Sequence, residues 1–381
     1  MSALTARVHD AAVLGGGLVG IAIAWGLQRQ GLSVVVLDEG DNAFRASRGN
    51  FALVWVQGKG HGMPAYTAWT RLSATEWPGL RDALEDETGI ATELQQPGGV
   101  ALCFSEAELA RRVAMFEDMQ RAAGNQGYDW RVVEGAEMRD MLPGVGPRVI
   151  AATYTPYDGH VNSLKLLHAL HRGFAAAGGE YRPGAKVTAA SAAPHDFRIE
   201  TEAGPVRAAR VVLAAGLGNR DLAPLFGLEA PVSPNKGQVL VTERARQTLP
   251  MPTNFIRQTG EGTVMLGDSK EDAGFDLSQD PDIMAGIARR AVDSFPWIGD
   301  LGIVRAWSAL RVMSADGFPI YAQSGAFPGA FVANCHSGVT LAAAHALALA
   351  PMIAAGELDP MLAPFTPDRF HSGRFHVPPA R

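Results

Sequence analysis

The pattern of apolar positions predicts a βαβ unit at the start of the chain. Residues 11–15 are apolar and end in glycine, which predicts a short buried strand, and residues 34–37 predict a second one. Between them, residues 18–30 predict a helix that ends at Gly31. A strand, a helix and a strand in close succession are typical of a parallel sheet with helices on its faces.

Downstream, the pattern predicts helices first and then strands. Residues 51–144 are expected to be mostly helical, because Ser105 and Glu108 have capping-box spacing and apolar residues follow them at helical spacing until Gly124. Asn162 is expected to cap another helix, which Gly178 ends. Short strands are expected at residues 186–189, 197–201, 206–215, 239–242, 254–257 and 263–267, followed by a strand at 330–333 and a helix at 340–350.

The order of these elements predicts two joined domains. The length of 381 residues exceeds what one small core usually organises. We expect a cofactor-binding domain formed by residues 1–48, 145–228 and 312–381. Residues 49–144 and 229–311 are expected to form a substrate-binding domain inserted into it.

Composition and charge exclude several classes of protein. The formal net charge of -6 provides no basic surface for nucleic acid, so no nucleic-acid partner is expected. Cys103 and Cys335 are too few to build a disulfide framework, a zinc site or an iron–sulfur site, so no metal is expected. No signal peptide is seen at residues 1–10, and the apolar run 338–356 is interrupted by His345 and Pro351. A cytoplasmic protein without a membrane span is therefore expected.

Three glycines follow the first predicted strand in the order GxGxxG. Gly15 permits a tight turn, Gly17 lets a pyrophosphate approach the backbone, and Gly20 lets the helix pack on the strand. The next residues, Leu18 and Val19, lie in the first helical turn, where free amides and the helix dipole attract phosphate. The alternative is a tight turn that binds no nucleotide.

An acidic pair ends the second predicted strand. Asp38 lies 18 residues after Gly20, which suits a carboxylate that accepts hydrogen bonds from ribose hydroxyls, and Glu39 follows it directly. The alternative is an acid exposed at a strand end. The glycines and the acid together predict a dinucleotide cofactor but do not separate FAD from NAD.

Segments spread over nearly the whole chain carry a resemblance that distinguishes FAD from NAD. They are Ala46-Ser47-Arg48-Gly49-Asn50, Gly159-His160-Val161-Asn162, Val211 to Gly216, Lys236-Gly237-Gln238, Gly267-Asp268-Ser269, Leu310-Arg311 and Asp316-Gly317-Phe318-Pro319. In this order they resemble the D-amino-acid oxidase and glycine oxidase superfamily. The resemblance implies FAD and an α/β fold, with an FAD-binding Rossmann-like domain of the glutathione-reductase type. It also implies an inserted α+β substrate domain that contains an antiparallel sheet.

Two segments resemble a narrower group. Residues 54–63 and the run from Cys335 to Thr340 are similar to FAD subunits of bacterial multi-subunit dehydrogenases for opines or D-hydroxyproline. That similarity implies partner subunits carrying an iron–sulfur cluster and a further flavin. The sequence departs from the superfamily at Arg48-Gly49-Asn50, where Arg-Asn is more usual. A stand-alone oxidase of glycine, sarcosine or a D-amino acid, and a non-catalytic flavin-carrying subunit, remain as alternatives.

The resemblance also assigns residues to the cofactor and the substrate. Besides the residues of the glycine-rich turn, those implied to contact FAD are Ser47, Arg48, Gly49, Asn50, Val187, Ala215, Gly216, Gly338, Val339 and Thr340. Arg311 is implied to bind the substrate carboxylate, since a planar guanidinium holds a carboxylate through two hydrogen bonds. Its alternative role is a surface ion pair.

Three further residues are candidates for contact with the substrate. His336 is expected beside the flavin, with a structural imidazole as its alternative, and Lys59 and His61 lie in a glycine-rich loop. The implied reaction is oxidation of a small amino or imino acid, with hydride passing from the α-carbon to flavin N5 and water hydrolysing the imine. Such a reaction requires alignment more than a catalytic acid.

Overall fold

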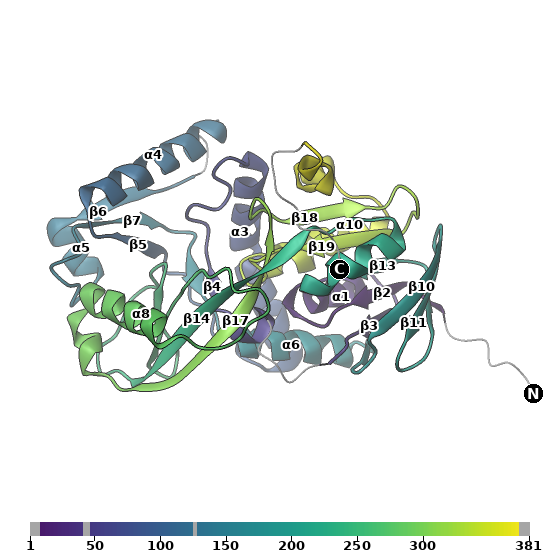
Figure 1. Cartoon of the computed structure of the whole chain (residues 1–381), viewed down its shortest axis with the longest axis horizontal. Helices are drawn as coiled ribbons and strands as arrows, with labels where there is room; N and C mark the ends of the chain where they lie inside the picture. Colours follow the sequence, from purple (N-terminus) through teal and green to yellow (C-terminus); the bar gives the residue numbers. More distant parts are fainter. Residues whose placement is uncertain (1–7, 41–45, 125–127, 373–381) are drawn as a thin grey trace, which may run out of the picture.

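The computed structural model describes residues 8–40, 46–124 and 128–372. Its central sheet has the strand order β18-β19-β13-β2-β3-β9, and only the β18–β19 pair is antiparallel. The six strands are β18 (Ile320–Gln323), β19 (Ala330–Asn334), β13 (Val211–Leu213), β2 (Ala11–Leu14), β3 (Val34–Leu37) and β9 (Glu180–Arg182). In Figure 1 segments far apart in sequence lie side by side here, with purple β2 and β3 next to teal β13.

Alternate residues of the central strands face two different cores. Val13 and Val36 face the helices, whereas Leu14 and Leu37 face a second, smaller sheet. The helical side consists of α1 (Leu18–Arg29), α3 (Pro64–Thr88), α6 (Ser163–Ala176), α9 (Ala342–Ala344), the π-helical turn His345–Leu349 and α10 (Ala350–Ala355). The smaller sheet has the order β1-β12-β11-β10, with β1 (Val8–His9), β12 (Val206–Ala208), β11 (Asp196–Thr201) and β10 (Val187–Ala193). Burial on both faces explains why the central strands read as continuous apolar runs.

The strand expected at residues 206–215 is two strands. β12 joins the smaller sheet and β13 joins the central sheet, so the chain passes from one sheet to the other between them. At the crossing, the amide of Ala209 donates to the carbonyl of His9 at 2.9 Å. An apolar run cannot reveal such a change of sheet, because both halves are buried.

A third sheet, antiparallel throughout, has four strands in the order β15-β16-β14-β17. Its strands are β14 (Val232–Arg244), β15 (Ile256–Gln258), β16 (Thr263–Leu266) and β17 (Ile303–Ser314). Figure 1 shows β14 and β17 as a long pair that runs from the side of α8 (Pro281–Ser294) toward the central sheet. The expected antiparallel sheet is therefore present, and its two long strands connect the two halves of the molecule.

Residues 51–144 contain strands as well as the expected helices. Helices α3, α4 (Glu106–Ala122) and α5 (Gly135–Met141) agree with the prediction, and Ser105 caps α4 by accepting from the amide of Glu108. The prediction omitted β4 (Leu53–Val54), β5 (Gly99–Cys103) and β6 (Arg131–Glu134). β5 and β6 both pair with β7 (Ala151–Thr155), and β4 pairs with β8 (Gly159–His160). A domain boundary at residue 145 therefore separates β7 from the strands with which it pairs.

The length and composition of the described helices determine whether any of them could span a membrane. No single helix in residues 8–40, 46–124 and 128–372 is long and apolar enough to cross a membrane. The segments Ala342–Ala355 and Pro360–Phe370 meet the criterion only as a pair, and they are bent by 107° relative to each other.

Candidate active site

The glycine-rich turn lies where the carboxyl ends of β2 and β13 meet the N-terminus of α1. Gly15 has a φ of 107°, and a Cβ atom there would lie 2.6 Å from the carbonyl oxygen of Ala214 and 2.7 Å from Cα of Ala215. A Cβ atom on Gly20 would overlap the carbonyl oxygen of Gly15. Both positions therefore require glycine, one for its backbone conformation and the other for close packing of helix on turn. Ala215 lies directly beside this turn, and Gly216 follows it in the chain.

The first turn of α1 presents free amides. The amide of Leu18 donates to Oγ of Ser47 at 2.9 Å. The amides of Gly17 and Val19 donate to no atom of the chain as far as the structure describes it. Free amides at a helix N-terminus form a ready site for a phosphate group, so this turn fits the pyrophosphate of a dinucleotide.

Asp38 is engaged by the backbone around the turn. Its carboxylate accepts from the amide of Gly16 at 2.6 Å and from the amide of Gly40 at 2.7 Å. Its carbonyl oxygen accepts from Ala185, two residues before Val187, and so brings β10 to the same strand end. Glu39 is exposed beside it. Asp38 therefore orders the turn through both oxygens of its carboxylate.

The short helix α2 (Ala46–Gly49) closes the site from the other side. Arg48 lies in this helix, and Asn50, which follows it, donates from Nδ2 to the carbonyl of Ser47 at 2.9 Å. Oδ1 of Asn50 is buried and has no hydrogen-bond partner in the described chain. Because a buried acceptor usually has a partner, this oxygen fits a donor on a bound cofactor.

The loop before α9 completes the cofactor site. A Cβ atom on Gly338 would lie 3.5 Å from the side chain of Val19 and 3.8 Å from that of Leu18, so the loop touches the first turn of α1. In the described chain no acceptor is present for the amides of Gly338 and Val339. The side chain of Thr340 is occupied, since it accepts from the amide of Trp55 and donates to the carbonyl of Leu53, both at 3.2 Å. The carbonyl of Thr340 also accepts from Ser73 and Trp77, so the amide of Thr340 is the group that could serve a cofactor.

Lys59 and His336 meet beside this loop. Nζ of Lys59 donates to Oγ of Ser337 at 2.5 Å and lies 3.4 Å from Nε2 of His336, while the hydroxyl of Tyr66 also donates to Ser337 at 3.0 Å. Burial lowers the pKa of Lys59 to about 8. Burial and the positive charge of Lys59 lower the pKa of His336 well below its usual value. Nε2 of a neutral His336 is then the acceptor that faces the ammonium.

A buried carboxylate supports the loop that carries Lys59. Asp158 is fully buried, accepts from the amide of Val56 at 2.5 Å and accepts from Nε2 of Gln57 at 2.8 Å. Burial raises the pKa of Asp158 to about 7, against the effect of these hydrogen bonds. Sequence reasoning missed this residue, because its partners lie about a hundred positions earlier in the chain.

Arg311 lies on the face of β17 that packs against α2. Trp307 on the same face donates from Nε1 to the carbonyl of Gly49 at 2.9 Å, and Ala309 lies against Gly49. Since alternate residues of a strand share a face, Arg311 points to the same side. Its guanidinium passes over Gly237 of β14, where a Cβ atom would overlap it.

The guanidinium of Arg311 already has four acceptors. It donates to Oδ1 of Asn235 at 3.0 Å, to the carbonyl of Lys236 at 3.2 Å and to the carbonyl of Ser269 at 2.8 Å. It also forms an ion pair with the carboxylate of Asp268. A substrate carboxylate at Arg311 would therefore compete with Asp268.

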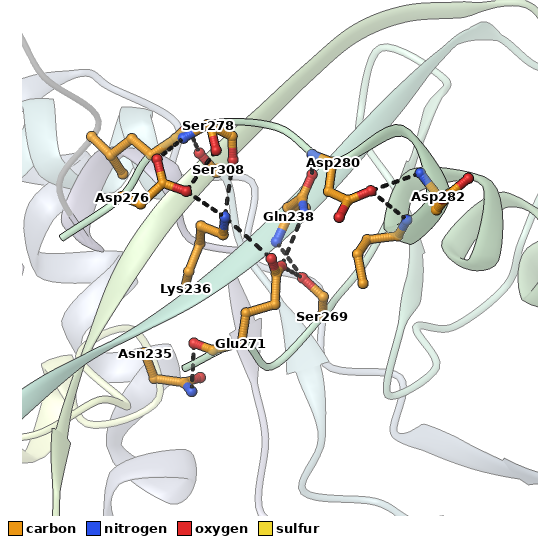
Figure 2. Close-up of polar contacts among 12 residues, drawn as sticks. Asn235, Lys236, Gln238, Ser269, Glu271, Asp276, Ser278, Asp280, Asp282 and Ser308 are labelled. Atoms are coloured by element: carbon orange, nitrogen blue, oxygen red, sulfur yellow. Dashed lines mark hydrogen bonds and ion pairs between the residues drawn. The ribbon is translucent and has the colours of Figure 1, made fainter. Parts of the chain in front are cut away.

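The segment that carries Asp268 is fastened to β14 by the polar network of Figure 2. Nζ of Lys236, a nearly buried side chain, lies 3.2 Å from Glu271 and 3.2 Å from Asp276. Nε2 of Gln238 donates to Glu271 at 3.0 Å, and the backbone amide of Gln238 donates to Oγ of Ser269 at 2.9 Å. These contacts fix residues 268–280 along β14. They thereby position the exposed Lys270 and Asp268, the partner of Arg311.

The structure brings most of the predicted residues together, with one exception. His61 is exposed, and its Nε2 lies 3.6 Å from Asp118 on α4 rather than beside Lys59. Sequence reasoning did not assign Ser337, Asp268 or Lys270 to the site, although Ser337 and Asp268 lie within segments that carried the resemblance. Burial raises the pKa of Cys335 to about 12, as suits a thiol that packs against the core.

Comparisons with known proteins identify the family. The family model described as "FAD dependent oxidoreductase" matches residues 10–352. The chain is 45% identical over 363 residues to an opine oxidase subunit of Agrobacterium tumefaciens (strain Ach5), covering 95% of this chain and 98% of that protein. It is 26% identical to glycine oxidase of Pseudomonas aeruginosa over 93% of this chain and 97% of that one.

A solved structure shows the same fold. The glycine oxidase from Geobacillus kaustophilus superposes with a TM-score of 0.86 at 24% identity, covering 94% of this chain and 98% of that chain. FAD is the cofactor, and the free amides of Gly17 and Val19, the carboxylate of Asp38 and the buried oxygen of Asn50 fit it. The chain belongs to the FAD-dependent oxidoreductase family.

Proposed function

We propose that the chain oxidises the C–N bond of an amino or imino acid. We further propose that it is the catalytic subunit of a multi-subunit dehydrogenase for an opine-like or D-hydroxyproline-like substrate. The observation that carries this proposal is a group of cations beside the loop before α9: Nζ of Lys59 lies 3.4 Å from Nε2 of His336 and donates to Ser337, and the charges of Arg311 and Lys270 also act on His336. The similarity to an opine oxidase subunit over 95% of the chain supports the subunit role.

The charges of this group suit an anionic substrate with an uncharged amine. Arg311 pairs with Asp268, and Lys59 and Lys270 add positive charge near His336, so a carboxylate gains Coulomb energy there and an ammonium group loses it. Selecting the neutral amine leaves its lone pair available to assist departure of the hydrogen from the α-carbon. FAD, when bound, accepts the hydride that the α-carbon loses.

Each residue of the group has a separate task in the proposed reaction. Arg311 holds the substrate carboxylate in exchange for Asp268, which fixes where the α-carbon lies. Lys59 supplies a second positive charge beside Ser337. His336 stays neutral, and its Nε2 remains the acceptor that faces Lys59.

Anaerobic bleaching of the flavin tests the proposal directly. Glycine, sarcosine, D- and L-proline, D-hydroxyproline and opines are each mixed with the holoprotein without oxygen, and flavin absorbance is followed. We expect at least one carboxylate-bearing secondary amine to reduce the flavin within seconds to minutes. Failure of all of them, with dithionite still reducing the flavin, would instead favour the non-catalytic, flavin-carrying subunit.

The electron acceptor separates a dehydrogenase from a stand-alone oxidase. The chain has two cysteines, whereas an iron–sulfur cluster is normally held by four, so a relay of that kind requires another polypeptide. We expect the substrate-reduced chain to be reoxidised by air much more slowly than an artificial acceptor dye reoxidises it. Stopped-flow reoxidation measures both rates. Stoichiometric hydrogen peroxide released at the rate of turnover would contradict the dehydrogenase and establish an oxidase.

The pKa of Lys59 predicts how substrate binding depends on pH. With a pKa of about 8, Lys59 is a cation below pH 8 and loses its charge as the pH rises through that value. Because the substrate amine also loses its proton over this range, the test uses a carboxylate inhibitor without an amine, such as acetate, and we expect its inhibition constant to rise between pH 7 and pH 9. Lys59→Gln is expected to raise this inhibition constant about tenfold at pH 7, the scale of one charged hydrogen bond, and to remove this pH dependence.

A matched variant provides the control for this experiment. Lys270→Gln removes an exposed cation that also acts on His336 but has no contact with Ser337. It is expected to keep the rise of the inhibition constant above pH 8. If Lys59→Gln keeps the same pH dependence as the wild type, Lys59 does not bind the substrate.

A further inference from the structure

A cavity of about 320 Å³ lies between α4, β5, the start of β15 and α8. Three arginines line it: Arg111 and Arg112 from α4 and Arg290 from α8. One acid, Glu108, also lines the cavity, but its carboxylate accepts from the amide of Phe104 at 2.6 Å at the start of α4. The oxidation proposed above uses none of these side chains.

The arginines are held in place without carboxylate partners. Arg112 donates to Oγ1 of Thr153 at 2.8 Å and to Oε1 of Gln57 at 2.9 Å. Arg290 donates to the carbonyl of Gly267 at 2.8 Å, and its guanidinium lies 4.1 Å from the ring centroid of Phe255. Within residues 8–40, 46–124 and 128–372, none of the three guanidiniums forms an ion pair with an acid. Arg112 and Arg290 are therefore held in fixed orientations before any ligand binds.

Such an arrangement is costly unless an anion is bound. Like charges that converge on one cavity repel each other, and desolvation by burial lowers the pKa of both Arg112 and Arg290. Nε of Arg290 is buried and finds no acceptor in the described chain. A guanidinium matches the planar geometry of a carboxylate or the oxygens of a phosphate. An anion in the cavity would relieve the repulsion and supply acceptors.

The cavity adjoins both segments that form the candidate active site. The carbonyl groups that accept from Arg290 belong to Gly267 and Asp268, and the side chain of Asp268 pairs with Arg311. On the other side, Met115 lines the cavity and lies against Gly58, the neighbour of Lys59. An occupant of the cavity would therefore contact Arg290, which is hydrogen-bonded to the backbone of Asp268, and Met115, which touches the neighbour of Lys59.

We propose that this cavity is a second binding site, for a small molecule that carries a carboxylate or phosphate group. Arg111 and Arg290 contact the anionic group, and Arg112 provides additional positive charge. The molecule is either a distal acidic arm of the substrate itself or a separate anion that binds beside it. The site depends on the arginines alone and stands whether or not the chain oxidises amino acids.

Calorimetric titration of the FAD-loaded protein with succinate and with inorganic phosphate, at constant ionic strength, tests this site. We expect saturable binding of at least one of them, with a dissociation constant raised at least about tenfold in Arg111→Gln and further in Arg111→Glu. Arg111 is exposed, so these variants should fold as the wild type does. Arg289→Gln, on the adjacent exposed position of α8 and outside the cavity, is expected to bind as the wild type does.

The same titration distinguishes the two sources of the anion. If saturation with a flavin-bleaching substrate abolishes succinate binding, the cavity holds part of the substrate, and if both bind together the cavity holds a separate ligand. The proposal fails if the wild type shows no saturable binding. It also fails if Arg111→Glu binds as tightly as Arg289→Gln. Because calorimetry requires no turnover, either failure is distinguishable from an error in the proposed reaction.

Discussion

Gly17→Val is expected to yield a folded protein that contains less than about a tenth of the wild-type FAD. A tenfold loss of affinity requires a loss of only about 1.4 kcal/mol of binding free energy. Gly17 precedes the first turn of α1, and a Cβ atom there would lie 2.8 Å from Oγ of Ser47. A serine hydroxyl can rotate away from one methyl group, so Gly17→Ala should be milder. The branched valine covers the free amides of Gly17 and Val19, which the pyrophosphate needs.

Flavin absorbance relative to protein, together with the free energy of unfolding, measures the effect. Gly79→Val provides the control, because Gly79 is exposed on α3 and a Cβ atom there meets nothing within 4 Å. It should retain full flavin. Full retention of flavin by Gly17→Val would show that the cofactor does not lie on the first turn of α1. If Gly17→Val loses both flavin and its fold, the loss of flavin cannot be assigned to the cofactor site. Circular dichroism must therefore show native helix content in this variant.

The cofactor site was predictable because its signals are local. The strand at 34–37 was predicted with its observed bounds, and helix α1 with its start at Leu18. Gly20 is required because of its contact with Gly15, five positions earlier, although Gly15 itself also lies against Ala214 and Ala215, far away in the sequence. Patterns of this length are the ones that single-sequence reasoning detects.

The omitted strands lacked such a signal. β5 reads Gly-Val-Ala-Leu-Cys and is buried throughout, so its residues do not alternate between apolar and polar. A short continuous apolar run of this kind does not distinguish a buried strand from part of a buried helix. The pairing with β7 that makes it a strand connects residues about fifty positions apart.

The contacts around the substrate could not be predicted for a related reason. Lys59 reaches Ser337 across 278 residues of sequence, and Arg311 reaches Asp268 across 43. Resemblance to a family suggested Arg311, and the sequence suggested His336 and Lys59 individually, but only the fold shows that Asp268 is bound to the guanidinium. It equally shows that His61, two residues from Lys59, faces α4 instead.

Arg311→Lys is expected to keep FAD and to lose at least about thirtyfold in kcat/KM, which corresponds to about 2 kcal/mol, within the range of hydrogen bonds to charged groups. The guanidinium spans four acceptors, on Asn235, Lys236, Asp268 and Ser269. A lysine ammonium keeps the charge but lacks the planar fork, so it cannot span these acceptors or hold a substrate carboxylate through two parallel hydrogen bonds.

Steady-state kinetics with the best flavin-bleaching substrate measure this loss, and Asp268→Asn adds an independent readout. If the substrate carboxylate displaces Asp268 from Arg311, Asp268→Asn weakens this competitor and should lower KM. The loss in Arg311→Lys should instead appear as a rise in KM. A purely structural ion pair predicts the opposite, because Asp268→Asn would then loosen Arg311 and raise KM. Arg305→Lys, at an exposed position of the same strand, serves as the control and should leave kcat/KM unchanged. Wild-type kinetics in Arg311→Lys would remove Arg311 from the substrate site, and equal losses in Arg311→Lys and Asp268→Asn would make the pair a structural element of β17.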